Sequence, residues 1–289
     1  MKKAGLSACS GAHMPNNPKI TVLSDNLALP DYECEHGFAL HLKLADRQIL
    51  MDAGCDAKLM LRNAERAGLS LEQLDCLVIS HGHYDHVGAV ASLLELSPEL
   101  QIFAHPNILK QRYSIRNQIP KDIAVPANIR RTLENCQNKR SFRGRISLFD
   151  GVELFNEIPR TNNFEDTGGP FFCDKAGEVA DPIEDETVIC IRSGKELLVL
   201  SGCSHTGIVN ILQYMQQQYP DCIFRAVIGG LHLVNADAKR LQITLHELKR
   251  FAIANLIACH CSGEEAMRKI ADNIPGANCF GAAGKQWQF

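Results

Sequence analysis

The sequence predicts an α/β fold in which two β-sheets pack face to face and helices cover their outer sides. Each half of the chain contains a β-hairpin pattern, at 38–54 and at 187–200, and then changes to alternating strand and helix patterns. Such a succession suits two packed sheets with helices outside. A hydrophobic fraction of 45% with 22% charged residues is sufficient for a sizeable core.

The individual elements follow from local patterns. Strands are predicted where apolar residues alternate or run together between turn residues, and helices where they recur every three or four positions. In the first half these are strands at 19–23, 38–44, 48–54, 74–79 and 101–105, with helices at 56–67 and 87–94. In the second half they are strands at 147–149, 152–155, 187–191, 196–200, 224–228, 255–259 and 278–280, with helices at 208–218, 236–250 and 263–273.

The remaining segments are assigned by composition. Residues 1–18 are predicted to be a disordered N-terminal extension, and 19–289 to form one domain with a basic, helical insertion near 107–145. From 110 to 145 there are ten basic residues against two acidic ones. Such a segment can be a solvated face, a dimer surface, or a lid that attracts anions. The polar, glycine-rich stretch 160–186 is predicted to be a long loop over a site.

Composition narrows the class of protein. A net charge of −3 gives no general affinity for nucleic acid, and no apolar stretch has the length of a membrane span. The twelve cysteines do not indicate a disulfide scaffold, because the chain is long and Cys76, Cys190 and Cys259 lie in apolar runs. We therefore expect a cytoplasmic protein that binds neither nucleic acid nor membrane, with a homodimer left open.

The first candidate site is the run from His81 to His86, which follows the predicted strand 74–79. Residues two apart on an extended segment share a side, so His81 and His83 can bind one metal ion. Asp85 and His86 lie past the turn and can reach a second ion. Imidazole and carboxylate suit zinc, iron and manganese, and two ions that share a hydroxide form a hydrolytic centre. A chance cluster of polar loop residues is the alternative, and four potential ligands within six residues, directly after an apolar strand, argue against it.

Further ligands are expected at other strand ends, because a rigid sheet positions side chains well. His205, His232 and His260 each follow an apolar strand and a turn. We expect His205 and His260 to be ligands, and His232 to be a ligand, a substrate contact or a proton donor. Asp52 can orient a ligating imidazole or serve only as a turn residue. Cys203 can be a thiolate ligand or a buried thiol.

Together these motifs resemble the metallo-β-lactamase superfamily from residue 19 to the end of the chain. Its first motif resembles 49–54, its second 81–86, and its last histidine motif His260. The strand 198–203 resembles the one on which most members carry a bridging aspartate. The chain is most similar to the branch related to 7,8-dihydropterin-6-yl-methyl-4-(β-D-ribofuranosyl)aminobenzene-5′-phosphate synthase. That similarity rests on the motifs Leu23-Ser24-Asp25-Asn26, Glu35-His36-Gly37-Phe38, Ile158-Pro159-Arg160, Gly202-Cys203-Ser204-His205-Thr206-Gly207-Ile208 and Gly229-Gly230-Leu231-His232-Leu233.

The resemblance implies an αββα sandwich of two mixed sheets, with the site at one edge. It also implies two divalent metal ions, for which we favour zinc over iron or manganese. The chain departs from the superfamily pattern in two places. There is no histidine in 106–204, where the third motif is expected. His205 can fill that role from a shifted place, and Asp185 or Glu186 is another candidate. Cys203 replaces the bridging aspartate, or that ligand is lost.

The expected function is a metal-dependent hydrolase in which a hydroxide held by two ions attacks a phosphoester or similar anionic small molecule. Asp85 would orient the attacking water, and His232 would stabilise the developing charge. Arg160 and the basic segment would hold the phosphate, although Arg160 can equally be a surface residue. A transferase that joins a pterin to an aminobenzene riboside phosphate is one alternative. A ligand-binding protein without catalytic activity on the same scaffold is another.

Overall fold

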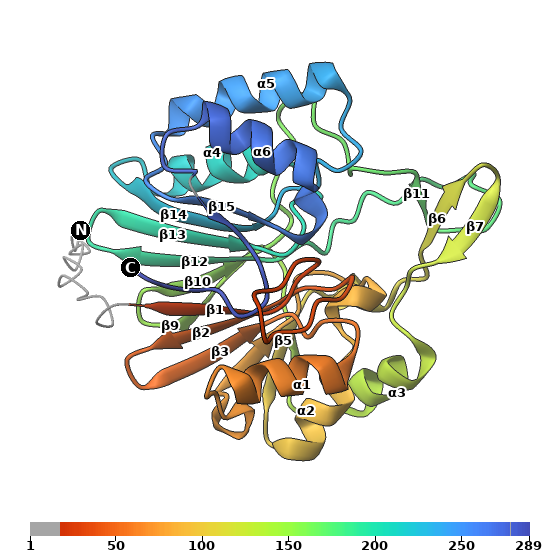
Figure 1. The fold of residues 1–289 in the computed structure, drawn as a ribbon. Helices are drawn as coiled ribbons and strands as arrows, with labels where there is room; N and C mark the ends of the chain where they lie inside the picture. Colours follow the sequence, from red (N-terminus) through yellow and green to blue (C-terminus); the bar gives the residue numbers. More distant parts are fainter. Residues whose placement is uncertain (1–17, 278) are drawn as a thin grey trace, which may run out of the picture.

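The computed structural model describes residues 18–277 and 279–289, in which two seven-stranded sheets pack face to face. The predicted extension 1–18 lies outside these residues, apart from Pro18. Three α-helices cover the outer side of each sheet, and a small third sheet projects from one end of the sandwich (Figure 1). No helix among the described residues has the length and apolar character needed to cross a membrane.

The first sheet has the strand order β17-β1-β2-β3-β4-β5-β8. Its strands are β1 (Lys19–Ser24), β2 (Ala39–Leu44), β3 (Arg47–Met51), β4 (Cys76–Val78), β5 (Gln101–Ala104), β8 (Lys139–Ser141) and β17 (Gln286–Gln288). The strands from β3 to β8 run parallel, and the others pair antiparallel. Its outer side is covered by α1 (Ala57–Arg66), α2 (Val90–Leu96) and α3 (Ala127–Asn135). β17 was not predicted, because three residues are too few for a strand pattern.

The second sheet has the order β16-β15-β14-β13-β12-β10-β9. Its strands are β9 (Arg145–Phe149), β10 (Val152–Phe155), β12 (Val188–Ser193), β13 (Glu196–Ser201), β14 (Ile223–Gly230), β15 (Leu256–Cys259) and β16 (Cys279–Phe280). Its parallel part, from β13 to β16, is covered by α4 (Ile208–Gln218), α5 (Ala238–Leu248) and α6 (Glu264–Asn273). Parallel strands that are buried on both faces read as continuous apolar runs, which is why they could be predicted.

The apolar core has three layers. Side chains such as Ile20, Leu40 and Leu198 fill the space between the two sheets. The other two layers lie beneath the helices on either side. Five single turns of 3₁₀ helix complete the structure: Leu71–Gln73, Tyr84–His86, Pro106–Leu109, Lys249–Phe251 and His260–Ser262. Two of these turns, at Tyr84–His86 and His260–Ser262, carry predicted site residues.

The basic insertion 107–145 is only partly helical, which corrects the prediction. Its first part is a hairpin of β6 (Tyr113–Arg116) and β7 (Ile119–Asp122), joined in a small sheet by β11 (Phe171–Phe172). The hairpin turns at Asn117 and Gln118, which both have positive φ, the backbone that two-residue hairpin turns require. Pro120 fits because β7 is an edge strand, where a missing N–H costs no ladder bond. We call the sheet β11-β6-β7 the arm.

Candidate metal centre

The predicted site residues meet at one edge of the sandwich, because they follow strands that end there. Asp52 follows β3, the run 81–86 follows β4, and the residues 203–205 follow β13. His232 follows β14 and His260 follows β15. The C-terminal ends of strands from both sheets therefore supply one site.

The first donor group consists of His81, His83 and His205, whose ligand atoms all lie within 4.8 Å of one another. His81 Nε2 is 2.9 Å from His83 Nδ1 and 3.2 Å from His205 Nε2. Burial, with the neighbouring histidines, holds the pKa of His81 and His205 well below its usual range. Burial and the Arg112 charge do the same to the pKa of His83. These imidazoles are therefore neutral, which is the form that binds metal.

The second donor group lies around the carboxylate of Asp85. His36 Nε2 is 3.2 Å and His260 Nε2 is 3.4 Å from Asp85 Oδ2, and His86 Nε2 is 4.0 Å from the same atom. Burial alone would raise the pKa of Asp85, but the imidazoles of His86 and His260 lower it. The carboxylate is therefore ionised and surrounded by three imidazoles. His36 belongs to a motif that we singled out in the sequence, but we did not predict it in the site.

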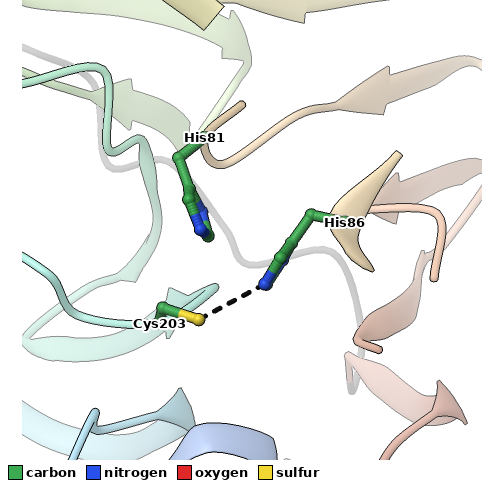
Figure 2. A group of neighbouring side chains, drawn as sticks. All are labelled: His81, His86 and Cys203. Carbon is green, nitrogen blue, oxygen red and sulfur yellow. Dashed lines mark hydrogen bonds between the residues drawn. The ribbon is translucent and has the colours of Figure 1, made fainter. Parts of the chain in front are cut away.

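Cys203 lies between the two groups. Figure 2 shows His81, His86 and Cys203 pointing toward one another, and Cys203 Sγ is 3.3 Å from His86 Nε2. The thiol also forms a group with His232 and Cys261, again within 4.8 Å. Burial raises the pKa of the Cys203 thiol well above its usual range. A bound cation would reverse that shift, because a coordinating thiol loses its proton.

Asp52 orients His86 and His81 through a short hydrogen-bond chain. Its carboxylate accepts hydrogen bonds from Ser80 N, Ser80 Oγ and His86 Nδ1, each at 2.7 Å. Because the Ser80 hydroxyl donates its one proton to Asp52, it must accept from His81 Nδ1, 2.9 Å away. Both imidazoles thus carry their proton on Nδ1 and present a free Nε2.

His205 and His260 are oriented in the same manner. His205 Nδ1 donates to the carbonyl of Thr167 at 2.7 Å, and His260 Nδ1 donates to Asn26 Oδ1 at 2.7 Å. In both cases Nε2 is left for the site. His83 Nε2 is buried and has no hydrogen-bond partner among the described residues. A buried, unpartnered imidazole nitrogen is costly in the absence of a ligand, and a metal ion would satisfy it.

Asp185 and Glu186, the other candidates for the third motif, point elsewhere. Asp185 accepts from Gly82 N at 2.8 Å and binds the buried guanidinium of Arg112 through both oxygens. Glu186 accepts from the backbone N–H groups of His205 and Thr206, at 2.7 and 2.6 Å. Both acids therefore hold the loops that carry the histidines, and of the three candidates it is His205 whose ring joins His81 and His83 in a donor group.

A cavity of about 480 Å³ opens onto these groups. Its inner wall includes His83, Asp85, Cys203, His232 and His260. His232 Nδ1 is buried without a hydrogen-bond partner among the described residues. Burial and the nearby positive charges lower the pKa of His232 to about 3. His232 is therefore a neutral imidazole at physiological pH.

The structure does not bring Arg160 to this cavity, in contrast to its predicted substrate role. Its Nη2 donates to the carbonyl of Pro182 at 2.8 Å, and it lines a separate cavity beside Glu184. Phe171 was not predicted but packs on the histidines, with ring centroids 5.5 Å from His83 and His205. No pattern in the sequence distinguishes Phe171 from its neighbour Phe172.

The chain belongs to the metallo-β-lactamase superfamily, whose family model matches residues 42–209. A curated relative from Methanocaldococcus jannaschii is 28% identical over 263 residues, which cover 87% of this chain and 90% of the relative. That relative is named 7,8-dihydropterin-6-methyl-4-(beta-D-ribofuranosyl)-aminobenzene-5′-phosphate synthase. A second M. jannaschii protein, which is uncharacterized, is 25% identical over 87% of this chain and 93% of its own length.

Among solved structures, Tm1679, a metal-dependent hydrolase of the β-lactamase superfamily, aligns with a TM-score of 0.79 and 26% identity. The alignment covers 94% of this chain and 99% of Tm1679. These findings confirm the predicted αββα fold and the similarity to the synthase branch. The fold implies divalent metal ions, and imidazoles, an ionised carboxylate and a thiol are donors that fit them.

Proposed function

We propose that this protein is a hydrolase that uses two zinc ions to cleave a phosphoester or a similar anionic small molecule. The observation that carries the proposal is the pair of adjacent donor groups with Cys203 between them. In this assignment His81, His83 and His205 hold one ion. The set that holds the other consists of Asp85, His86 and His260, with Cys203 as a shared or second-ion ligand.

The donor types favour zinc over manganese. Imidazole suits several transition metals, but a thiolate such as Cys203 is a soft ligand that selects zinc or iron–sulfur chemistry over harder ions. The ten cysteines whose side chains the structure describes are free thiols. That supports a reducing compartment and hence the cytoplasm, where a thiol ligand stays available.

Bound divalent ions supply Lewis acidity and a nucleophilic water at neutral pH. The chain contributes the rest. The Asp85 carboxylate accepts a hydrogen bond and orients that water, because it lies in the cavity wall and is ionised. His232 lines the cavity and is neutral, so its ring can hold a hydrogen bond to the oxygen on which charge develops. Phe171 covers the histidine rings and keeps bulk water from them.

The first test counts metal ions per chain in untagged protein that has been purified without chelators. Two ions per chain, together with turnover of phosphomonoester or phosphodiester substrates, would support the proposal. Cobalt substitution gives a second readout, because thiolate coordination produces a strong near-ultraviolet charge-transfer band. That band should be lost in Cys203→Ser. Protein that binds no added zinc, manganese or iron would refute the proposal.

A synthase activity is the second candidate, and the similarity to the M. jannaschii synthase over most of both chains favours it. The same Lewis-acid site could assist group transfer from a pterin to an aminobenzene riboside phosphate. Incubating the metal-loaded protein with both substrates distinguishes the two functions. Formation of the joined product without phosphoester hydrolysis would replace the hydrolase proposal.

A further inference from the structure

The arm forms the outer wall of the metal-site cavity. Figure 1 shows it projecting from one end of the sandwich. Its side chains Ser114, Arg116, Ile119, Lys121 and Phe171 line the same cavity as Asp85 and the histidines. One wall of the cavity therefore consists of predicted metal-ligand residues, and the other consists of residues of the arm.

The arm is fixed to the loop that carries the metal-ligand residues. Tyr84 N donates to the carbonyl of Ile123 at 3.1 Å, directly after β7. At the root of β6, the buried Arg112 binds Asp185, which also accepts from Gly82 N. These contacts hold the arm's cavity-facing residues at a set position relative to the predicted metal ligands.

Arg116 and Lys121 present unpaired positive charge to the cavity. Both are exposed, and neither has a carboxylate within ion-pair distance among residues 18–277 and 279–289. In the same basic segment, by contrast, Lys110, Arg143 and Arg145 each bind a glutamate. Lys121 Nζ lies 4.8 Å from the ring centroid of Tyr84 and 3.1 Å from its hydroxyl. Cations held at a cavity wall without a carboxylate partner are suited to bind an anionic ligand.

Between the charges the wall is apolar. Ile119 is 71% exposed and Val234 is 57% exposed, and both line the cavity. Phe171 and Tyr84 add aromatic surface. Exposed apolar side chains gathered at a cavity indicate a ligand with an apolar or planar body. The volume of about 480 Å³ is that of a site for a small organic molecule, much larger than a single phosphate.

We infer that the arm selects substrates with two anionic ends and a planar or apolar body between them. The reacting ester lies at the predicted metal ligands, the body packs against Ile119, Phe171 and Val234, and a second anionic group binds Arg116 and Lys121. The inference rests on the proposed function for the position of the reacting end. It replaces Arg160 by Arg116 and Lys121 as the cations that recognise the substrate.

The test measures binding of phosphonates, which have no ester to hydrolyse, to zinc-loaded protein by calorimetry. The probes are phenylphosphonate and two analogues with a second anion, 4-carboxyphenylphosphonate and 4′-carboxybiphenyl-4-phosphonate. Methylphosphonate, which lacks the body, is the fourth probe. We expect phenylphosphonate to bind more tightly than methylphosphonate, and the carboxylate to strengthen binding of at least one analogue by roughly five- to twentyfold.

The variants Arg116→Ala and Lys121→Ala should lose most of the gain from the carboxylate and leave phenylphosphonate binding and zinc content nearly unchanged. Arg131→Ala is the matched control, because Arg131 is an exposed residue of the same basic segment outside the cavity. If neither analogue gains from its carboxylate, or if Arg131→Ala reduces the gain as much, the inference is overturned. If no phosphonate binds zinc-loaded protein, the proposed function fails instead, so the two failures are distinct.

Discussion

Replacing Asp52 by asparagine should weaken metal binding, although Asp52 lies outside both donor groups. Its carboxylate accepts three hydrogen bonds, from Ser80 N, Ser80 Oγ and His86 Nδ1. Asparagine has nearly the same shape but only one acceptor oxygen. If the NH₂ group faces Ser80 N, two donors meet in a fully buried place. If it faces His86, the imidazole must move its proton to Nε2, which removes that nitrogen as a ligand.

Substitutions of groups that orient metal ligands typically reduce metal affinity by about 10- to 100-fold. For Asp52→Asn this corresponds to a loss of about 1.4–2.7 kcal/mol of binding free energy. The larger value is expected here, because one rotamer of the asparagine leaves Ser80 N without an acceptor and the other removes Nε2 of His86 as a ligand.

The measurement is the zinc dissociation constant, determined by competition with a chromophoric chelator. Asp75→Asn is the matched control, because Asp75 also accepts from a backbone N–H and a side chain, Gln48 N and Arg47 Nη1, but lies far from the site in the fold. A folded Asp52→Asn protein with the wild-type zinc affinity would refute the tautomer argument.

Three further predictions concern stability. Arg112→Met should lower the free energy of unfolding by about 3–5 kcal/mol, since it leaves buried carboxylates unpaired. The double variant Arg112→Met/Asp185→Asn should recover part of that loss in urea unfolding, and no recovery would contradict the pairing. Gly82→Ala should yield little soluble, metal-binding protein, because its Cβ would lie 1.8 Å from the carbonyl oxygen of Ile108. Normal yield and zinc content would show that the loop can move. Burial depresses the pKa of His232 to about 3, so below pH ~6.5 the unfolded state binds a proton that the folded state does not. The metal-free protein should therefore lose stability as the pH falls from ~6.5 toward 3, and His232→Gln should reduce the slope by up to about 1.4 kcal/mol per pH unit. If the free energy of unfolding depends on pH equally in both proteins, a group other than His232 causes the pH dependence.

The sequence was sufficient for the two packed sheets and for the histidines at their edge. Buried parallel strands such as β13 and β15 are continuous apolar runs, and each is followed by a predicted ligand at its end. Parallel strands end at the same edge of a sheet. Residues that follow such strands can therefore be predicted to lie close together, even when they are far apart in the sequence. Coordinates were needed to show that His205 is the candidate that joins His81 and His83, because Asp185 and Glu186 also fitted the sequence.

The arm could not be predicted, because β7 has no buried face and β6 has a single buried residue, Tyr113, so neither strand imposes an alternating pattern. Every residue of β7 is exposed. Its residue types therefore reflect contact with solvent and the neighbouring turn, and they contain no strand pattern. The position of Arg160 was also predicted incorrectly, again because the local sequence does not determine it. A basic residue beside a glycine-rich loop can point into a site or away from it, and only the hydrogen bond to Pro182 decides the direction.

The group of His81, His83 and His205 and the group around Asp85 each draw on both halves of the chain. His81 and His83 follow a strand of the first sheet, whereas His205 follows a strand of the second. Asn26, after β1, positions His260 across the same boundary. A bound ion would therefore join the two sheets as a crosslink that forms and breaks with metal supply. By linkage, free ion at 100 times its dissociation constant adds about 2.7 kcal/mol to stability. In a metal-starved cell we expect the abundance of the protein to fall with its occupancy, because the unlinked halves open more often to proteases.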